Sequence, residues 1–151
     1  MRRISLLIPV LLAAGLAVAA PVDLGKSVKL TVSTKAPYGD YLTDVDGRSL
    51  YVFLADNRSR ESKASNCYGP CTASWPPLNT ADDPLAGPRV QTLKVGTMQR
   101  RNSHVQVTYN GWPLYYYAGD EKPGDTRGQD KHGFGAEWYL ISPEGQIIEA
   151  E

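Results

Sequence analysis

The stretch Asn110-Gly-Trp-Pro-Leu-Tyr-Tyr-Tyr-Ala-Gly-Asp120 has a counterpart earlier in the chain, Asp46-Gly-Arg-Ser-Leu-Tyr-Val-Phe-Leu-Ala-Asp56. The glycine, the leucine, the first tyrosine, an aromatic residue and the final aspartate coincide at a constant offset of 64 residues. A tryptophan follows the final aspartate in both cases, Trp75 after 19 residues and Trp138 after 18. Self-similarity at a fixed offset indicates a repeated structural unit, so we predict two copies of one unit.

Turn residues between short apolar runs predict that the chain is built from β-strands. Asp46-Gly47 and Asn110-Gly111 favour tight hairpin turns because both positions tolerate positive φ, and Pro143-Glu-Gly145 marks a third hairpin. Alternation of apolar and polar residues predicts half-buried strands around these turns. The predicted strands cover 28–34, 41–43, 49–54, 90–95, 104–109, 112–117, 138–142 and 146–149, with one short helical turn within 67–74.

These elements predict an all-β fold, a small single-domain sandwich or barrel built from two homologous β units with long loops. The first unit is expected at about 38–78 and the second at about 102–143. The relative orientation of the two units does not follow from the repeat. The aromatic residues of both copies are expected to meet in one shared core.

The N-terminal residues have the pattern of a secretory signal peptide. Arg2 and Arg3 precede an apolar run, and Ala17-Val-Ala19 supplies the small residues of a cleavage site. The run is about 15 residues long, shorter than the ~20 that a membrane-spanning helix needs. We therefore predict a signal peptide at 1–19, a single domain at 20–151, no membrane span after cleavage, and a periplasmic or secreted protein.

The charge balance narrows the class of partner. Lysine and arginine number 16, as do aspartate and glutamate, and removal of the leader takes away two of the basic residues. A protein that binds nucleic acid needs a basic face, and one that docks on anionic lipid needs a basic cluster. We therefore expect no nucleic-acid partner, and instead an envelope protein or a small ligand.

Both copies fit the pattern Tyr-x-(Phe/Trp/Tyr)-x-x-Asp, as Tyr51-Val-Phe-Leu-Ala-Asp56 and Tyr115-Tyr-Tyr-Ala-Gly-Asp120. With Tyr41-Leu-Thr-Asp44, Trp75-Pro-Pro-Leu78 and Val107-Thr-Tyr-Asn-Gly-Trp-Pro-Leu114, the chain resembles the secreted-repeat family of bacterial lipoproteins. The resemblance spans about residues 38–143 and implies a bacterial envelope protein without an established activity. The chain departs from a lipoprotein because its first cysteine is Cys67, far from the leader, which favours an untethered form.

The motif supplies six candidate site residues. Alternate residues of a strand share a face, so within each copy the tyrosine and the aromatic residue after it point together. The structural interpretation is two aromatic ladders in one core, with hydroxyls at the rim and aspartates that accept backbone N–H bonds in the loops. The alternative is an aromatic face that binds a small ligand, a sugar or a peptide. The candidates are Tyr51, Phe53, Asp56, Tyr115, Tyr117 and Asp120.

No catalytic residue is predicted. A Tyr–Asp pair can act as an acid or base only beside a partner in a cleft, and the sequence offers no recognisable nucleophile arrangement. The protein is therefore expected not to be an enzyme. The favoured function is a non-enzymatic binding or interaction module without a cofactor.

Cys67 and Cys71 allow two interpretations. Two cysteines in an exported chain usually pair, so a disulfide that holds the first long loop is predicted. The alternative is a copper-handling or thiol-redox protein, in which the two thiols act with His104, His132 or Met98, because these side chains suit copper.

Overall fold

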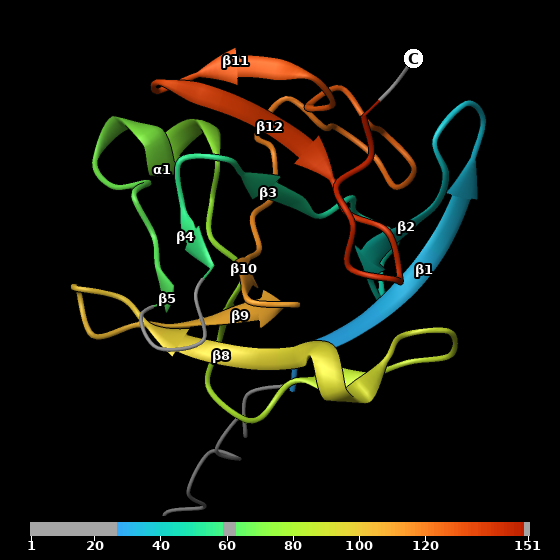
Figure 1. Cartoon of the computed structure of the whole chain (residues 1–151), viewed down its shortest axis with the longest axis horizontal. Helices are drawn as coiled ribbons and strands as arrows, with labels where there is room; N and C mark the ends of the chain where they lie inside the picture. Colours follow the sequence, from blue (N-terminus) through green and yellow to red (C-terminus); the bar gives the residue numbers. More distant parts are fainter. Residues whose placement is uncertain (1–26, 59–62, 150–151) are drawn as a thin grey trace, which may run out of the picture.

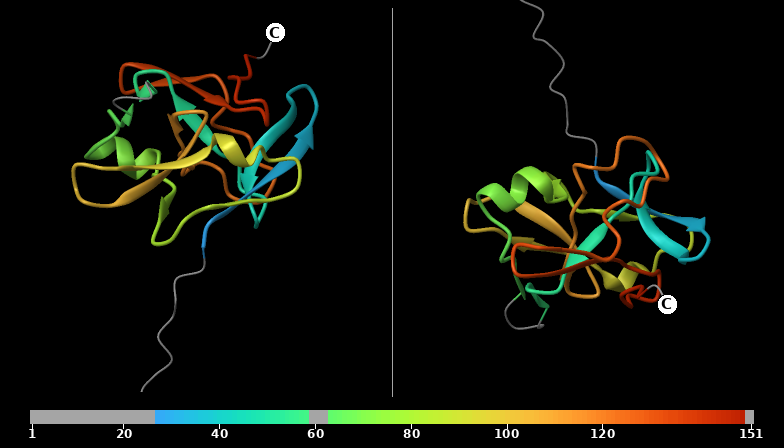
Figure 2. Two further views of the ribbon diagram at one scale, coloured as in Figure 1. Left: turned by 60° about the horizontal axis from the view of Figure 1, so that its bottom comes forward. Right: turned by 90° about the horizontal axis from the view of Figure 1, so that it is seen from above.

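Short β-strands in three sheets and one ribbon supply most of the regular secondary structure of the computed structural model, which describes residues 27–58 and 63–149 (Figures 1 and 2). The predicted leader at 1–19 lies outside the described residues. The first sheet has the order β2 (Gly39–Asp44), β1 (Lys29–Lys35), β7 (Leu85–Ala86). The second has the order β10 (Trp112–Pro113), β9 (Val105–Tyr109), β6 (Asn79–Thr80), with β8 (Val95–Gln99) also paired to β9.

The third sheet combines strands from the two units. Its order is β11 (Lys131–Gly133), β12 (Ala136–Leu140), β3 (Tyr51–Phe53). A two-stranded ribbon consists of β4 (Asn57–Arg58) and β5 (Lys63–Ala64), and the helical elements are α1 (Pro70–Ser74) and a 3-10 turn η1 (Thr92–Lys94). No helix within the described ranges is long and apolar enough to cross a bilayer.

The predicted turns form where their residues indicate. Asn110 and Gly111 have φ of 48° and 84°, and they connect β9 to β10 with Tyr109 opposite Trp112. This is the positive-φ pair that a two-residue hairpin requires. Gly145, with φ of 82°, turns the chain so that Ile141 pairs with Ile147 through an isolated bridge.

The two units exchange their segments across the centre of the molecule. Tyr51 and Tyr115, equivalent residues of the two copies, face one another and exchange both backbone hydrogen bonds at 2.9 Å. The motif strand of the first unit pairs with the tryptophan strand of the second, with Phe53 opposite Trp138. In the second unit, the amide of Ala118 donates to the carbonyl of Ser74, next to Trp75. The third sheet is therefore complete only when both units contribute to it.

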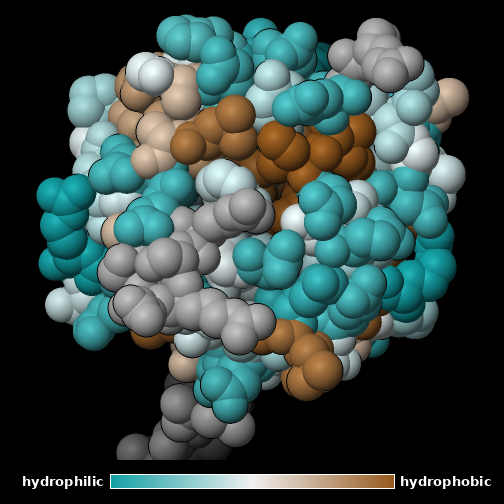
Figure 3. All heavy atoms as spheres, viewed as in Figure 1, coloured by the Kyte–Doolittle hydropathy of each residue, from teal (hydrophilic) through white to brown (hydrophobic). Residues whose placement is uncertain are grey.

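Two hydrophobic clusters fill the interior, and the three consecutive tyrosines divide between them. Tyr115 and Tyr117 point into an aromatic cluster with both cysteines, whereas Tyr116 packs against an aliphatic cluster on the other side of the strand. This is the alternation of side chains that an extended chain imposes. The face of the molecule shown in Figure 3 is mostly hydrophilic, with an apolar patch in its upper half.

The all-β class and the two-unit construction are confirmed, with strands in separate short sheets rather than a closed barrel. The strand predicted at 90–95 is wrong in all but its last residue, because Val90 lies buried in a turn and Thr92–Lys94 forms η1. Leu93 is fully exposed there, so the run of apolar residues does not reflect one buried face. At 146–149 only the Ile147 bridge forms, and the predicted helical turn is present as α1.

Candidate functional site

A stack of four aromatic rings occupies the centre of the aromatic cluster. Trp75 and Trp138, the equivalent tryptophans, lie face to face with ring centroids 3.9 Å apart and planes within 3°. Phe53 stacks on the outer face of Trp138 at 4.1 Å, and Tyr117 lies on that of Trp75 at 4.4 Å. Each unit supplies the same two positions, and the second half of the stack repeats the first in reverse order. This is the arrangement of an approximate twofold axis between the two tryptophans.

The first tyrosine of each motif forms a hydrogen bond with the aspartate of the other motif. The Tyr115 hydroxyl donates to Asp56 Oδ2 at 2.6 Å, and the Tyr51 hydroxyl donates to Asp120 Oδ2 at 2.8 Å. The tyrosine rings also meet the tryptophans edge-on, Tyr115 on Trp138 at 5.1 Å and Tyr51 on Trp75 at 5.5 Å. The expectation that these hydroxyls reach the rim of the core was wrong, because both tyrosines are fully buried and each hydroxyl meets a carboxylate of the other unit.

Both aspartates also hold the loop that follows their own strand, as the sequence predicts. Asp56 Oδ1 accepts the amide of Asn66 at 2.7 Å, and Asp120 Oδ1 accepts the amide of Arg127 at 2.9 Å. Each carboxylate therefore uses one oxygen for its own unit and the other for the partner unit. The motif residues are thus brought together as one central arrangement.

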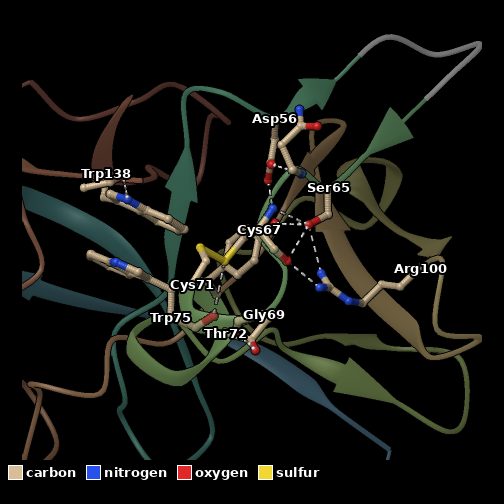
Figure 4. Close-up of a disulfide and its surroundings, with 12 residues drawn as sticks. Asp56, Ser65, Cys67, Gly69, Cys71, Thr72, Trp75, Arg100 and Trp138 are labelled. Atoms are coloured by element: carbon tan, nitrogen blue, oxygen red, sulfur yellow. Dashed lines mark hydrogen bonds between the residues drawn. A yellow bond between two sulfur atoms is a disulfide. The ribbon is translucent and has the colours of Figure 1, made fainter. Parts of the chain in front are cut away.

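The first of these carboxylates lies in a closed, polar network (Figure 4). Ser65 Oγ lies 2.7 Å from the Tyr115 hydroxyl and accepts Arg100 Nη1 at 2.9 Å. Arg100 is buried and also donates to Gln106 Oε1 and to the carbonyl of Cys67, both at 2.6 Å. The buried Asp56 carboxylate and the buried Arg100 guanidinium are thereby linked through Tyr115 and Ser65 rather than by direct contact.

Burial controls the ionisation of this network. It raises the pKa of Asp56 to about 6, and the Tyr115 hydroxyl, the Asn66 amide and Arg100 partly oppose the shift. Burial, reinforced by the Asp56 carboxylate, raises the pKa of Tyr115. The network thus keeps a neutral phenol hydrogen-bonded to a carboxylate.

The second carboxylate is more open. Burial raises the pKa of Asp120, although the Tyr51 hydroxyl and the Arg127 amide oppose it, and the side chain is only half-buried. The Tyr51 hydroxyl here also accepts the amide of Gly128 at 3.2 Å. A Cβ at Gly128 would lie 2.8 Å from Tyr51 Cζ, so this close approach requires glycine.

A cavity of about 260 Å³ borders the open carboxylate. Its wall is formed by the turn at 46–48 and the segment 120–123, and it carries both signs of charge. The Arg48 guanidinium lies 3.8 Å from the centre of the Tyr116 ring, whose hydroxyl donates to Asp44 Oδ2 at 2.8 Å. The lining residues are Asp46, Arg48, Asp120, Glu121, Lys122 and Pro123.

Cys67 and Cys71 form the predicted disulfide, which ties Cys71 of α1 to the loop before it, and both residues are buried in the aromatic cluster (Figure 4). In this state neither sulfur is a thiolate, so copper binding at the pair would first require reduction. His104 lies exposed near Asn79, His132 is exposed on β11, and Met98 is buried on β8. Within the described residues, no three His, Cys, Asp or Glu side chains are grouped in a way that could hold a metal.

Sequence reasoning missed the polar half of the site. Arg100 belongs to an Arg-Arg-Asn-Ser segment that resembles an exposed turn, and Ser65 carries no motif. The one available signal was proximity, because Ser65 lies two residues before Cys67 and its hydroxyl accepts the amide of that cysteine. Burial of Arg100 depends on three acceptors from two separate segments, the 65–67 loop and β9, which no local pattern reveals.

Comparison with known proteins agrees with this two-unit arrangement. Residues 32–79 and 96–142 each match the family model described as a secreted repeat of unknown function. The chain belongs to this family. The two matches divide the molecule into the units that exchange their motif strands, and the description of the family as secreted agrees with an exported protein. No curated protein and no solved structure matches the chain.

Proposed function

We propose that this secreted-repeat protein is a non-enzymatic binding module of the bacterial envelope, and that its ligand site is the cavity beside Asp120. The supporting observation is the difference between the two motif carboxylates. Asp56 is enclosed, whereas Asp120 is half-buried and forms part of a cavity wall. The motif aromatics are occupied with one another, so they build the scaffold that supports this wall.

The charges around the cavity favour a compact ligand that carries both an anionic and a cationic group. Arg48 is stacked on Tyr116, which fixes the guanidinium plane and leaves its N–H edge for a carboxylate. Asp46 and Asp120 supply negative charge for an ammonium group. The cavity is below the roughly 300–1,000 Å³ of pockets for drug-sized ligands, so an amino acid or a peptide end is the expected class.

A larger hollow of about 500 Å³ beside His104 is a weaker candidate. Its wall contains mainly small or uncharged residues, such as Asn79, Thr80 and Ser103, and no residue of the repeated motif.

Amide chemical shifts measured during titration with leucine test the site. Leucine should shift the amides of Asp46, Arg48 and Lys122, while leucinamide, which lacks the carboxylate, should not. Arg48→Ala should abolish the response. Arg101→Ala is the matched control, because Arg101 also stacks on a tyrosine, 4.3 Å from the Tyr68 ring centre, but lies outside the cavity.

Two results would contradict the proposal. If neither leucine nor a short peptide moves the cavity amides, the cavity is not the binding site. If the ligand is recovered chemically altered, the protein is an enzyme. Copper handling remains the alternative function, and a native mass with both thiols free and a copper adduct would favour it.

A further inference from the structure

Five oxidisable rings in the aromatic cluster form one continuous series of contacts. Trp75 and Trp138 are stacked at 3.9 Å, Tyr115 meets Trp138 at 5.1 Å, and Tyr51 meets Trp75 at 5.5 Å. Tyr117 lies 4.4 Å from Trp75 and 6.4 Å from Tyr51. Rings in such contact exchange single electrons readily, because the orbital overlap between neighbours is large.

The two ends of the four-ring stack differ chemically. Phe53 closes the end on Trp138, is 1% exposed, and is much harder to oxidise than the other rings. Tyr117 occupies the equivalent place on Trp75, is oxidisable, and is only half-buried. The series of rings is therefore capped on the Phe53 side and reaches solvent at Tyr117.

The two buried tyrosines that meet the tryptophans edge-on each have a base for their proton. A phenol loses its proton when it loses an electron, so an adjacent acceptor decides how readily it is oxidised. Tyr115 donates to Asp56 and Tyr51 donates to Asp120, and a carboxylate is a far better proton acceptor than a carbonyl oxygen. Tyr109 offers the contrast, because this buried tyrosine of the other cluster donates to the Pro143 carbonyl.

We propose that the ring cluster is a one-electron relay, which moves an oxidising equivalent from the buried tryptophan pair to the carboxylate-bound tyrosines and lets an external reductant remove it at Tyr117. The first step transfers one electron from a tryptophan to an external one-electron oxidant and leaves a tryptophan radical cation. Tyr51 or Tyr115 then gives an electron to that tryptophan and its phenol proton to Asp120 or Asp56. The products are a neutral tyrosyl radical, a protonated carboxyl and a restored tryptophan.

The last step restores the starting state. An external one-electron reductant, such as ascorbate, supplies an electron through Tyr117, and the proton returns from the carboxyl to the phenolate. Charge and protons balance over the cycle. The proposal needs no ligand in the cavity, although the relay and the cavity wall share Asp120.

Laser photoionisation, which ejects an electron from tryptophan regardless of burial, tests the internal step. The Trp112→Phe variant leaves only the stacked pair among the three tryptophans. The absorption of the tryptophan radical should decay as that of the tyrosyl radical rises, at one rate that does not depend on protein concentration. Decay without a tyrosyl rise, or a rate proportional to concentration, would overturn the relay.

Hydroxyl deletions identify the acceptors. The Tyr51→Phe, Tyr115→Phe double variant should lose most of the tyrosyl rise, whereas Tyr109→Phe should keep it. An unchanged rise in the double variant would refute the assignment. If the double variant does not fold, electron paramagnetic resonance of the frozen, photoionised parent decides the question, because the relay requires a tyrosyl signal and a persistent tryptophan signal excludes it.

Repair by ascorbate tests the opening at Tyr117. Tyr117→Phe should slow the disappearance of the tyrosyl radical in ascorbate without changing the internal transfer. Tyr139→Phe is the matched control, because Tyr139 is half-buried but packs against the aliphatic cluster. Equal repair rates in the parent and Tyr117→Phe would show that electrons do not enter at Tyr117.

Discussion

Asp56 and Asp120 occupy the same position in the two copies of the motif, but their surroundings differ. Asp56 is 7% exposed, and a disulfide-held loop with a buried arginine closes over it. Asp120 is followed by a glycine-bearing loop without a disulfide, and it borders a cavity. The difference shows how a duplicated unit can use one copy to stabilise the molecule and leave the other open. Both copies still supply half of each central hydrogen-bonded pair.

Removal of either stacked tryptophan should have the largest effect, because each unit supplies one ring of the central pair. Trp138→Ala and Trp75→Ala should each lower the free energy of unfolding by about 3–5 kcal/mol, the usual loss for a large buried aromatic residue. Chemical denaturation measures the loss, with Leu93→Ala as an exposed control. Strongly unequal losses would contradict the approximate twofold relation of the stack.

The pH dependence of stability should expose the enclosed carboxylate. The folded pKa of Asp56 is about 6, above its ordinary value of 3.8, so the folded state binds this proton more tightly than the unfolded chain does. Stability contributed by the protonated group is present below pH ~4 and is lost as pH rises to ~6, by roughly 3 kcal/mol.

Denaturation of the parent and of Asp56→Asn across this pH range isolates the contribution. Asparagine keeps a hydrogen-bond acceptor and does not titrate. The parent should lose stability relative to Asp56→Asn as pH rises from ~4 to ~6. A parent that gains stability relative to Asp56→Asn between these pH values would contradict the burial of this carboxylate.

Loss of the disulfide should affect the first unit's loop and the Arg100 network packed against it. Cys67→Ser with Cys71→Ser should cost about 2 kcal/mol, because the bridge closes a short loop. Thermal unfolding measures the loss, and reduction of the parent should reproduce it. Amide shifts should change around Ser65 and Arg100 and remain unchanged at the Asp120 cavity. Changes that spread to the cavity would show that the two environments are coupled.

The smallest effect is the difference between the two tyrosine hydroxyls. Tyr115→Phe leaves a buried carboxylate without its donor and should cost about 2 kcal/mol, within the range for hydrogen bonds to charged groups. Tyr51→Phe should cost about 1 kcal/mol, because water can reach Asp120 and replace the hydroxyl. Equal losses in urea denaturation would mean that the two carboxylates are equally solvated.

Much of this architecture could be predicted from local residue patterns. The Asn110-Gly111 turn needs only two residues that accept positive φ, and the cysteine pair needs only its spacing and an oxidising compartment. The failure at 90–95 has the same origin, because a run with Val90, Leu93 and Val95 has no fixed face until the rest of the chain decides which of them is buried.

The repeat alone determined that Tyr51 is equivalent to Tyr115 and Asp56 to Asp120. Equivalence does not say whether a tyrosine meets its own aspartate or that of the other copy, because both choices repeat at the same offset. The tertiary structure pairs each tyrosine with the aspartate of the other copy, because the Tyr51–Tyr115 bridge places each hydroxyl beside that carboxylate. The same packing buried Arg100 and left Asp120 open, because solvation depends on segments that are far apart in the sequence.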